Sequence, residues 1–105
     1  MLKDIKQKFF AYRNGIVADV LRRAGYPHSV IFGLQLPQIS EIARGLGPSE
    51  ELADALWADL DVRESRILAC YLYPKESVTK EKVEEMLASA RTQEEKDMIR
   101  FKLKV

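Results

Sequence analysis

The chain has 105 residues, of which 47% are hydrophobic and 31% charged, and 17 basic side chains almost balance 16 acidic ones. This length and composition predict a single helical-repeat domain over residues 1–105 with a core that needs no disulfide or metal. A single cysteine and a single histidine supply neither an intrachain disulfide nor a four-ligand zinc site, so we expect no metal and no cofactor. Because the chain has no run of 18 apolar residues, we expect a cytoplasmic protein without membrane association.

The net charge of +1 hides an uneven distribution of charge along the chain. Residues 1–45 carry seven bases and three acids, residues 46–95 six bases and twelve acids, and residues 96–105 four bases and one acid. A basic face that meets phosphate is compatible with this pattern. The alternative is an ordinary solvated helical surface.

In the first half of the chain, apolar residues recur with helical spacing and predict three helices. Asn14-Gly15 separates the first helix from the second, and Gly25 with Pro27 ends the second. A loop over about residues 25–36 follows, and Pro37 suits the first turn of the third helix. The three apolar stripes comprise Leu2, Ile5, Phe9 and Tyr12; Val17, Val20, Leu21 and Ala24; and Ile39, Ile42, Ala43 and Leu46.

The second half predicts four more helices joined by short connections. A fourth helix starts near Glu50, and a fifth, over about residues 62–73, is apolar on nearly every side and therefore central. A sixth helix follows, and Thr92 with Glu95 forms a capping-box pattern at the start of the seventh. The apolar positions of these helices are Leu52, Leu56 and Trp57; Ile67 to Leu72; Val83, Met86, Leu87 and Ala90; and Met98, Ile99, Phe101, Leu103 and Val105.

These elements predict an all-α protein, a HEAT-like or armadillo-type α-solenoid of about seven short antiparallel helices. A compact helical bundle is the alternative. The last helix ends without a cap or a polar face, so we expect its apolar residues Phe101, Leu103 and Val105 to be uncovered and to support a homodimer.

Four single residues are interpreted structurally. Cys70 lies in the most apolar helix and is expected to be a buried thiol, whereas His28 is expected to be a solvent-exposed loop residue. Arg66 is expected to form a salt bridge between helices, with Glu64, Asp61 or Asp59 as its partner. Trp57, beside apolar neighbours, is expected in the core.

One longer pattern resembles a known family. Four parts of the sequence carry it: the segment Phe32–Ala43, the pair Leu56-Trp57, the helix Arg63–Ala69, and the loop with Pro74 and Val78-Thr79. Their order and spacing resemble those of the DNA alkylation repair glycosylases, the AlkD-like HEAT-repeat family. The resemblance covers roughly residues 31–90 and corresponds to the amino-terminal half of such proteins.

The resemblance implies a DNA N-glycosylase that removes cationic alkylated purines such as 3-methyladenine and 7-methylguanine from duplex DNA, or a truncated or inactive relative of one. It puts Asp97 at the position of the family's catalytic aspartate, and Gln93 at the position of a tryptophan four residues earlier. Lys96, Arg100, Lys102 and Lys104 are candidates for contact with the phosphate backbone. The alternative function is a noncatalytic helical-repeat module that binds protein or self-associates.

Overall fold

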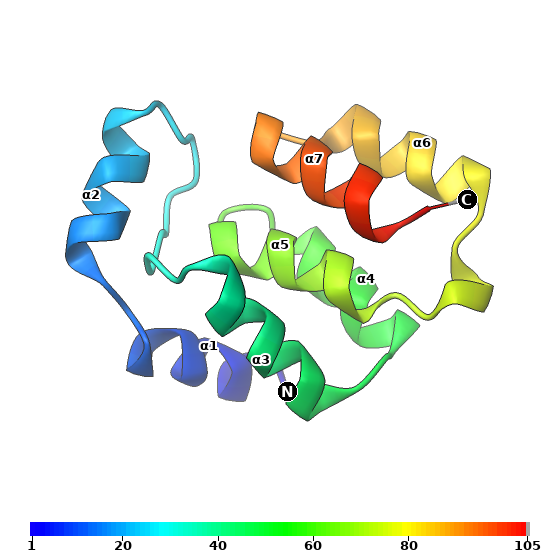
Figure 1. Cartoon of the computed structure of the whole chain (residues 1–105), viewed down its shortest axis with the longest axis horizontal. Coiled ribbons are helices and arrows are strands. Elements are labelled where there is room, and N and C mark those ends of the chain that lie inside the picture. Colours follow the sequence, from blue (N-terminus) through cyan, green and yellow to red (C-terminus); the bar gives the residue numbers. More distant parts are fainter. Residues whose placement is uncertain (105) are drawn as a thin grey trace.

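A computed structural model describes residues 1–104 as an all-α fold with a central helix (Figure 1). No strand occurs in this range; the only strand-like pairing is a parallel bridge between Val30 and Val62. The seven helices and one 3₁₀ turn are α1 (Leu2–Ala11), α2 (Gly15–Arg23), α3 (Leu36–Leu46), α4 (Glu50–Ala58), α5 (Arg63–Leu72), η1 (Lys75–Ser77), α6 (Lys80–Ser89) and α7 (Gln93–Lys102). The predicted helix order is confirmed, and successive helices pack as in HEAT-like repeats.

The central position of α5 follows from its sequence and is confirmed. It packs against α3, α4 and α7, and every residue from Arg63 to Cys70 is buried. Its Ile67, Leu68 and Ala69 are fully covered, as the apolar run predicts. Cys70 is also buried, and this burial raises the pKa of its thiol to about 12.

The helix ends use local signals. Asn14, Ser49, Thr79 and Thr92 each accept a hydrogen bond from a backbone N–H in the first turn of α2, α4, α6 and α7. At Thr92 only half of the predicted capping box forms. Thr92 Oγ1 accepts from the N–H of Glu95, but the Glu95 carboxylate turns inward and accepts from the N–H of Arg91.

Three expectations about burial are wrong or only partly right. His28 is 1% exposed, and its ring contacts the buried Glu95 of α7. At the other end of the chain, Leu103 is buried in the core while Phe101 is 65% exposed; Val105 lies outside the described residues. Trp57 is half-buried, and the Arg66 guanidinium lies 3.5 Å from the centre of its ring.

Helix α2 departs most from its sequence pattern. None of its residues is buried, and Ile16 and Val20 are 79% and 59% exposed. Figure 1 shows α2 at one end of the molecule, connected to the rest by the long loop that follows it. No helix in the described part of the chain is long and apolar enough to cross a membrane.

Candidate nucleic-acid interface

The predicted catalytic residue Asp97 lies on the exposed side of α7. Its Oδ1 atom accepts a hydrogen bond of 2.8 Å from the side-chain amide of Gln93, one turn earlier. Arg100, which is also exposed, follows Asp97 by three residues and therefore lies on the same side of the helix. This face thus combines one solvent-accessible carboxylate with one accessible guanidinium.

The other candidate cations do not all share this face. Lys102 lies with its Nζ atom 4.4 Å from the centre of the Tyr71 ring, and with Tyr71 it lines a separate open pocket beside Arg44. Lys104 follows the end of α7, 5.6 Å from the centre of the Phe101 ring. Lys96 is half-buried, so the five predicted site residues form a loose surface and not a single cluster.

Two sets of polar and charged side chains, all buried except the half-buried Glu94, join α7 and the loop before α3 to α5; we call the two sets the buried ion network. Its members are His28, Arg63, Glu64, Arg66, Glu94 and Glu95. Arg66 pairs with Glu95 at 3.2 Å and donates to the carbonyl oxygens of Trp57 and Ser89. The predicted salt bridge between helices therefore exists, but its partner comes from α7 and is none of the three acids expected from the sequence.

Glu95 is the centre of the set that it shares with His28 and Arg66, a role that the sequence did not reveal. Its Oε2 atom lies 2.6 Å from Nε2 of His28, which donates this hydrogen bond to the ionised carboxylate. Burial alone would raise the pKa of Glu95, but the hydrogen bonds from His28 and the Arg91 N–H, together with the charge of Arg66, outweigh it and hold the pKa below its usual value. His28 Nδ1 is buried and has no hydrogen-bond partner among the described residues.

Glu64, the second buried carboxylate, fixes the loop before α3. It accepts hydrogen bonds of 3.0, 3.0 and 3.3 Å from the N–H groups of Phe32, Gly33 and Leu34. Arg63 bridges Glu64 and Glu94, and burial of its guanidinium is offset by these two acids, so that its pKa is raised. The loop is therefore anchored to α5 through charge-assisted hydrogen bonds.

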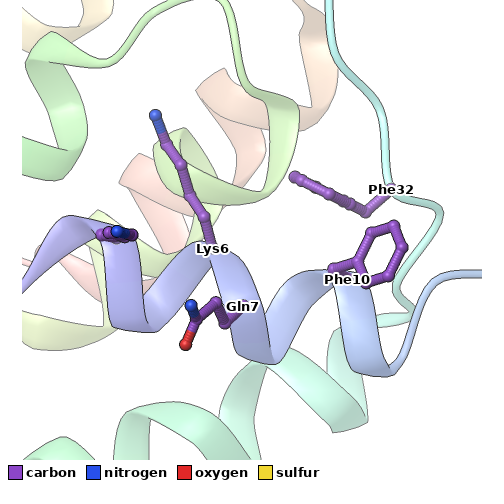
Figure 2. Close-up of a pocket in the computed structure, with 5 residues that line it drawn as sticks. Lys6, Gln7, Phe10 and Phe32 are labelled. Atoms are coloured by element: carbon purple, nitrogen blue, oxygen red, sulfur yellow. The ribbon is translucent and has the colours of Figure 1, made fainter.

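A groove that the sequence did not predict lies between α1 and this loop; we call it the α1–loop groove. Its first part, of about 590 Å³, is lined by Lys3, Lys6, Gln7, Phe10 and Phe32. Figure 2 shows the Phe10 and Phe32 side chains meeting from α1 and from the loop, with Lys6 and Gln7 further along the helix. A second part of about 350 Å³ shares both phenylalanines and adds Arg13 and Arg22. The spacing of Lys3, Lys6, Gln7 and Phe10 by three and four residues was the available sequence signal, since it places them on one helix face.

The α1–loop groove and the α7 face are separate surfaces. In Figure 1, α1 and α7 lie at opposite edges of the view, with α5 between them. The groove combines cations with the exposed ring of Phe10 and the half-buried ring of Phe32, whereas the α7 face presents the Asp97 carboxylate beside a cation.

Comparison with known protein families identifies a match over most of the chain. A model of the family described as DNA alkylation repair enzyme matches residues 5–99. No curated protein and no solved structure matches the chain significantly.

Proposed function

Since the chain belongs to the DNA alkylation repair enzyme family, we propose that it binds duplex DNA through the α7 face and removes cationic alkylated purines, with Asp97 as the reacting carboxylate. The observation that carries this proposal is the exposure of Asp97 next to Arg100 on one side of α7. A carboxylate on an exposed surface can reach the sugar of a nucleotide that remains in the duplex. Substrates of this kind include 3-methyladenine and 7-methylguanine.

Removal of a cationic purine requires few catalytic groups from the protein. Alkylation of a ring nitrogen gives the purine a positive charge, so the C1′–N bond can break with its electron pair returning to the base, which leaves neutral. The sugar then carries oxocarbenium character, which the negative charge of Asp97 stabilises. Water adds to C1′ and releases its proton to solvent. The hydrogen bond from Gln93 orients the Asp97 carboxylate for this role.

Binding to duplex DNA would use the cations around Asp97. Arg100 is the first candidate for a backbone phosphate, because it shares the exposed side of α7 with Asp97. Lys96, Lys102 and Lys104 add positive charge at the flanks of this face. Each phosphate neutralised by one of them makes the slope of log affinity against log salt concentration more negative by about 0.9.

The test is release of the damaged base from methylated duplex DNA. We expect the protein to release 3-methyladenine or 7-methylguanine, and Asp97→Asn to abolish release while DNA affinity stays the same or rises. Asp19→Asn is the matched control, since Asp19 is an exposed aspartate on α2 whose ion pair with Arg23 is open to solvent. Absence of release, or release by Asp97→Asn at the normal rate, contradicts the catalytic assignment.

Self-association without catalysis is the second candidate function, and one observation favours it. Phe101 is 65% exposed at the end of α7, although Leu103 beside it is buried and cannot contribute. A homodimer through Phe101 would appear in sedimentation as a concentration-dependent increase in mass that Phe101→Ser removes. A monomer at high concentration rules out this function.

A further inference from the structure

The charges that line the α1–loop groove have a single sign. Lys3, Lys6, Arg13 and Arg22 line its two parts, and no aspartate or glutamate does. The chain as a whole is almost neutral, with 17 bases and 16 acids, so this separation of charge is local. Asp59 pairs with Lys6 at 3.2 Å and neutralises part of one end. The remaining three cations give the groove complementarity to a polyanion.

The aromatic side chains add a second kind of contact. Phe10 is 56% exposed, and the guanidinium of Arg13 lies 3.9 Å from the centre of its ring. An exposed ring with a stacked guanidinium is a surface on which a planar base can stack, and such stacking is tolerant of base identity. A base within an intact duplex already stacks on its neighbours, so only an unpaired base can use this platform.

The groove is held in shape before any ligand arrives. The centre of the Phe32 ring lies 5.7 Å from the centre of the buried Phe9 ring. The Phe32 N–H donates to the Glu64 carboxylate, and the Phe32 carbonyl oxygen accepts from the N–H of Asn14. Arg22 donates to the carbonyl oxygens of His28 and Ser29, which keeps its guanidinium at the groove and leaves other N–H groups to bind phosphate. A preformed groove loses less conformational entropy on binding than a mobile one.

We propose that the α1–loop groove binds unpaired nucleotides of a nucleic-acid strand, with a base stacked on Phe10 and adjacent phosphates bound by Lys3, Arg13 and Arg22. Its two parts, of about 590 and 350 Å³, are of the size of ordinary ligand pockets, which run from about 300 to 1,000 Å³. The assignment extends the proposed function, and its relevance to repair rests on that function, but the groove lies away from α7 and is tested on its own.

The experiment measures binding of a fluorescein-labelled eight-nucleotide oligothymidylate by fluorescence anisotropy at several salt concentrations. We expect affinity to fall as salt rises, and Phe10→Ala to weaken binding about tenfold at every salt concentration. Lys3→Gln is expected to reduce the magnitude of the salt slope by about 0.7, the value for one phosphate contact with a single strand. Lys8→Gln on α1 and Tyr12→Ala directly after α1, both outside the groove, are the matched controls and leave affinity and slope unchanged.

Two further ligands show whether the groove recognises bases, phosphates or negative charge alone. An abasic oligonucleotide of the same length keeps the phosphates but has no bases, and polyglutamate keeps only negative charge. Equal binding of either ligand overturns the proposal, as does absence of oligothymidylate binding or insensitivity to Phe10→Ala. Because neither the ligand nor the variants involve Asp97 or methylated duplex, these outcomes are independent of the base-release assay.

Discussion

Replacing Glu64 by glutamine tests whether this buried carboxylate anchors the loop to α5. The carboxylate is fully buried and accepts from three consecutive backbone N–H groups and from Arg63. Glutamine has nearly the same shape but only one oxygen. That oxygen would stay at the Oε2 position, which has three donors, and the amide NH₂ would face the N–H of Phe32.

The cost follows from these contacts. Loss of one charge-assisted hydrogen bond costs about 2 kcal/mol, and weakening of the others to a neutral acceptor about 1 kcal/mol more. We therefore expect Glu64→Gln to lower the free energy of unfolding by about 3 kcal/mol, a large part of the roughly 5–15 kcal/mol of a typical domain.

Urea unfolding followed by circular dichroism measures the change. At an m-value of about 1.5 kcal/mol/M, the midpoint falls by about 2 M with the m-value itself unchanged. Glu84→Gln on the exposed surface of α6 is the control and changes stability by less than about 0.5 kcal/mol. A Glu64→Gln midpoint equal to that of the control would refute the anchoring role.

Three further predictions concern Glu95, two glycines with positive φ and Cys70. Because the pKa of Glu95 is lowered in the folded protein, its carboxylate contributes stability at pH values above its ordinary pKa of about 4.5. This contribution is lost as pH falls through the folded-state pKa. In an acid titration, Glu95→Gln should therefore lose less stability between neutral and acid pH than the unchanged protein. Gly33 and Gly25 both have positive φ, but of the two only Gly33 is placed so that a Cβ would collide with the carbonyl oxygen of Asn14. In urea unfolding, Gly25→Ala should lower the free energy of unfolding by about 1 kcal/mol, and Gly33→Ala should lower it by at least twice that amount. Cys70, with its pKa raised to about 12, should react with a thiol reagent at pH 8 at least tenfold more slowly in the folded protein than in urea, and equal rates would contradict its burial.

The candidate site was predictable only in part. Asp97 was proposed from the family resemblance and the cations near the end of the chain from their charge, and the roles of all five residues stay predictions; in the structure Asp97 and Arg100 are exposed. The α1–loop groove was missed, because Phe10 and Phe32 are separated by a helix and a loop, and nothing in their spacing says that they meet. The α7 stripe was misjudged at Leu103, which is covered by core side chains instead of being left open.

The sequence by itself determined the helices, their order and the central place of α5. Helical periodicity, glycine and proline stops and N-terminal caps act between residues a few positions apart, so they can be read along the chain. The burial of Cys70 and the existence of an ion pair at Arg66 could also be predicted locally. A thiol in an apolar helix is expected to be buried, and a cation in such a helix is expected to pair with an acid.

Only the tertiary structure decided which polar and charged groups meet. His28 and Glu95 are 67 positions apart, and Glu64 binds a loop about 30 positions earlier. That loop has no periodic pattern. Its path along α5 and α7 depends on two buried carboxylates: Glu64, which accepts from its backbone N–H groups, and Glu95, which binds its histidine. Partner choice in the buried ion network, and the shape of the α1–loop groove, therefore arise from packing between distant segments, which local spacing does not encode.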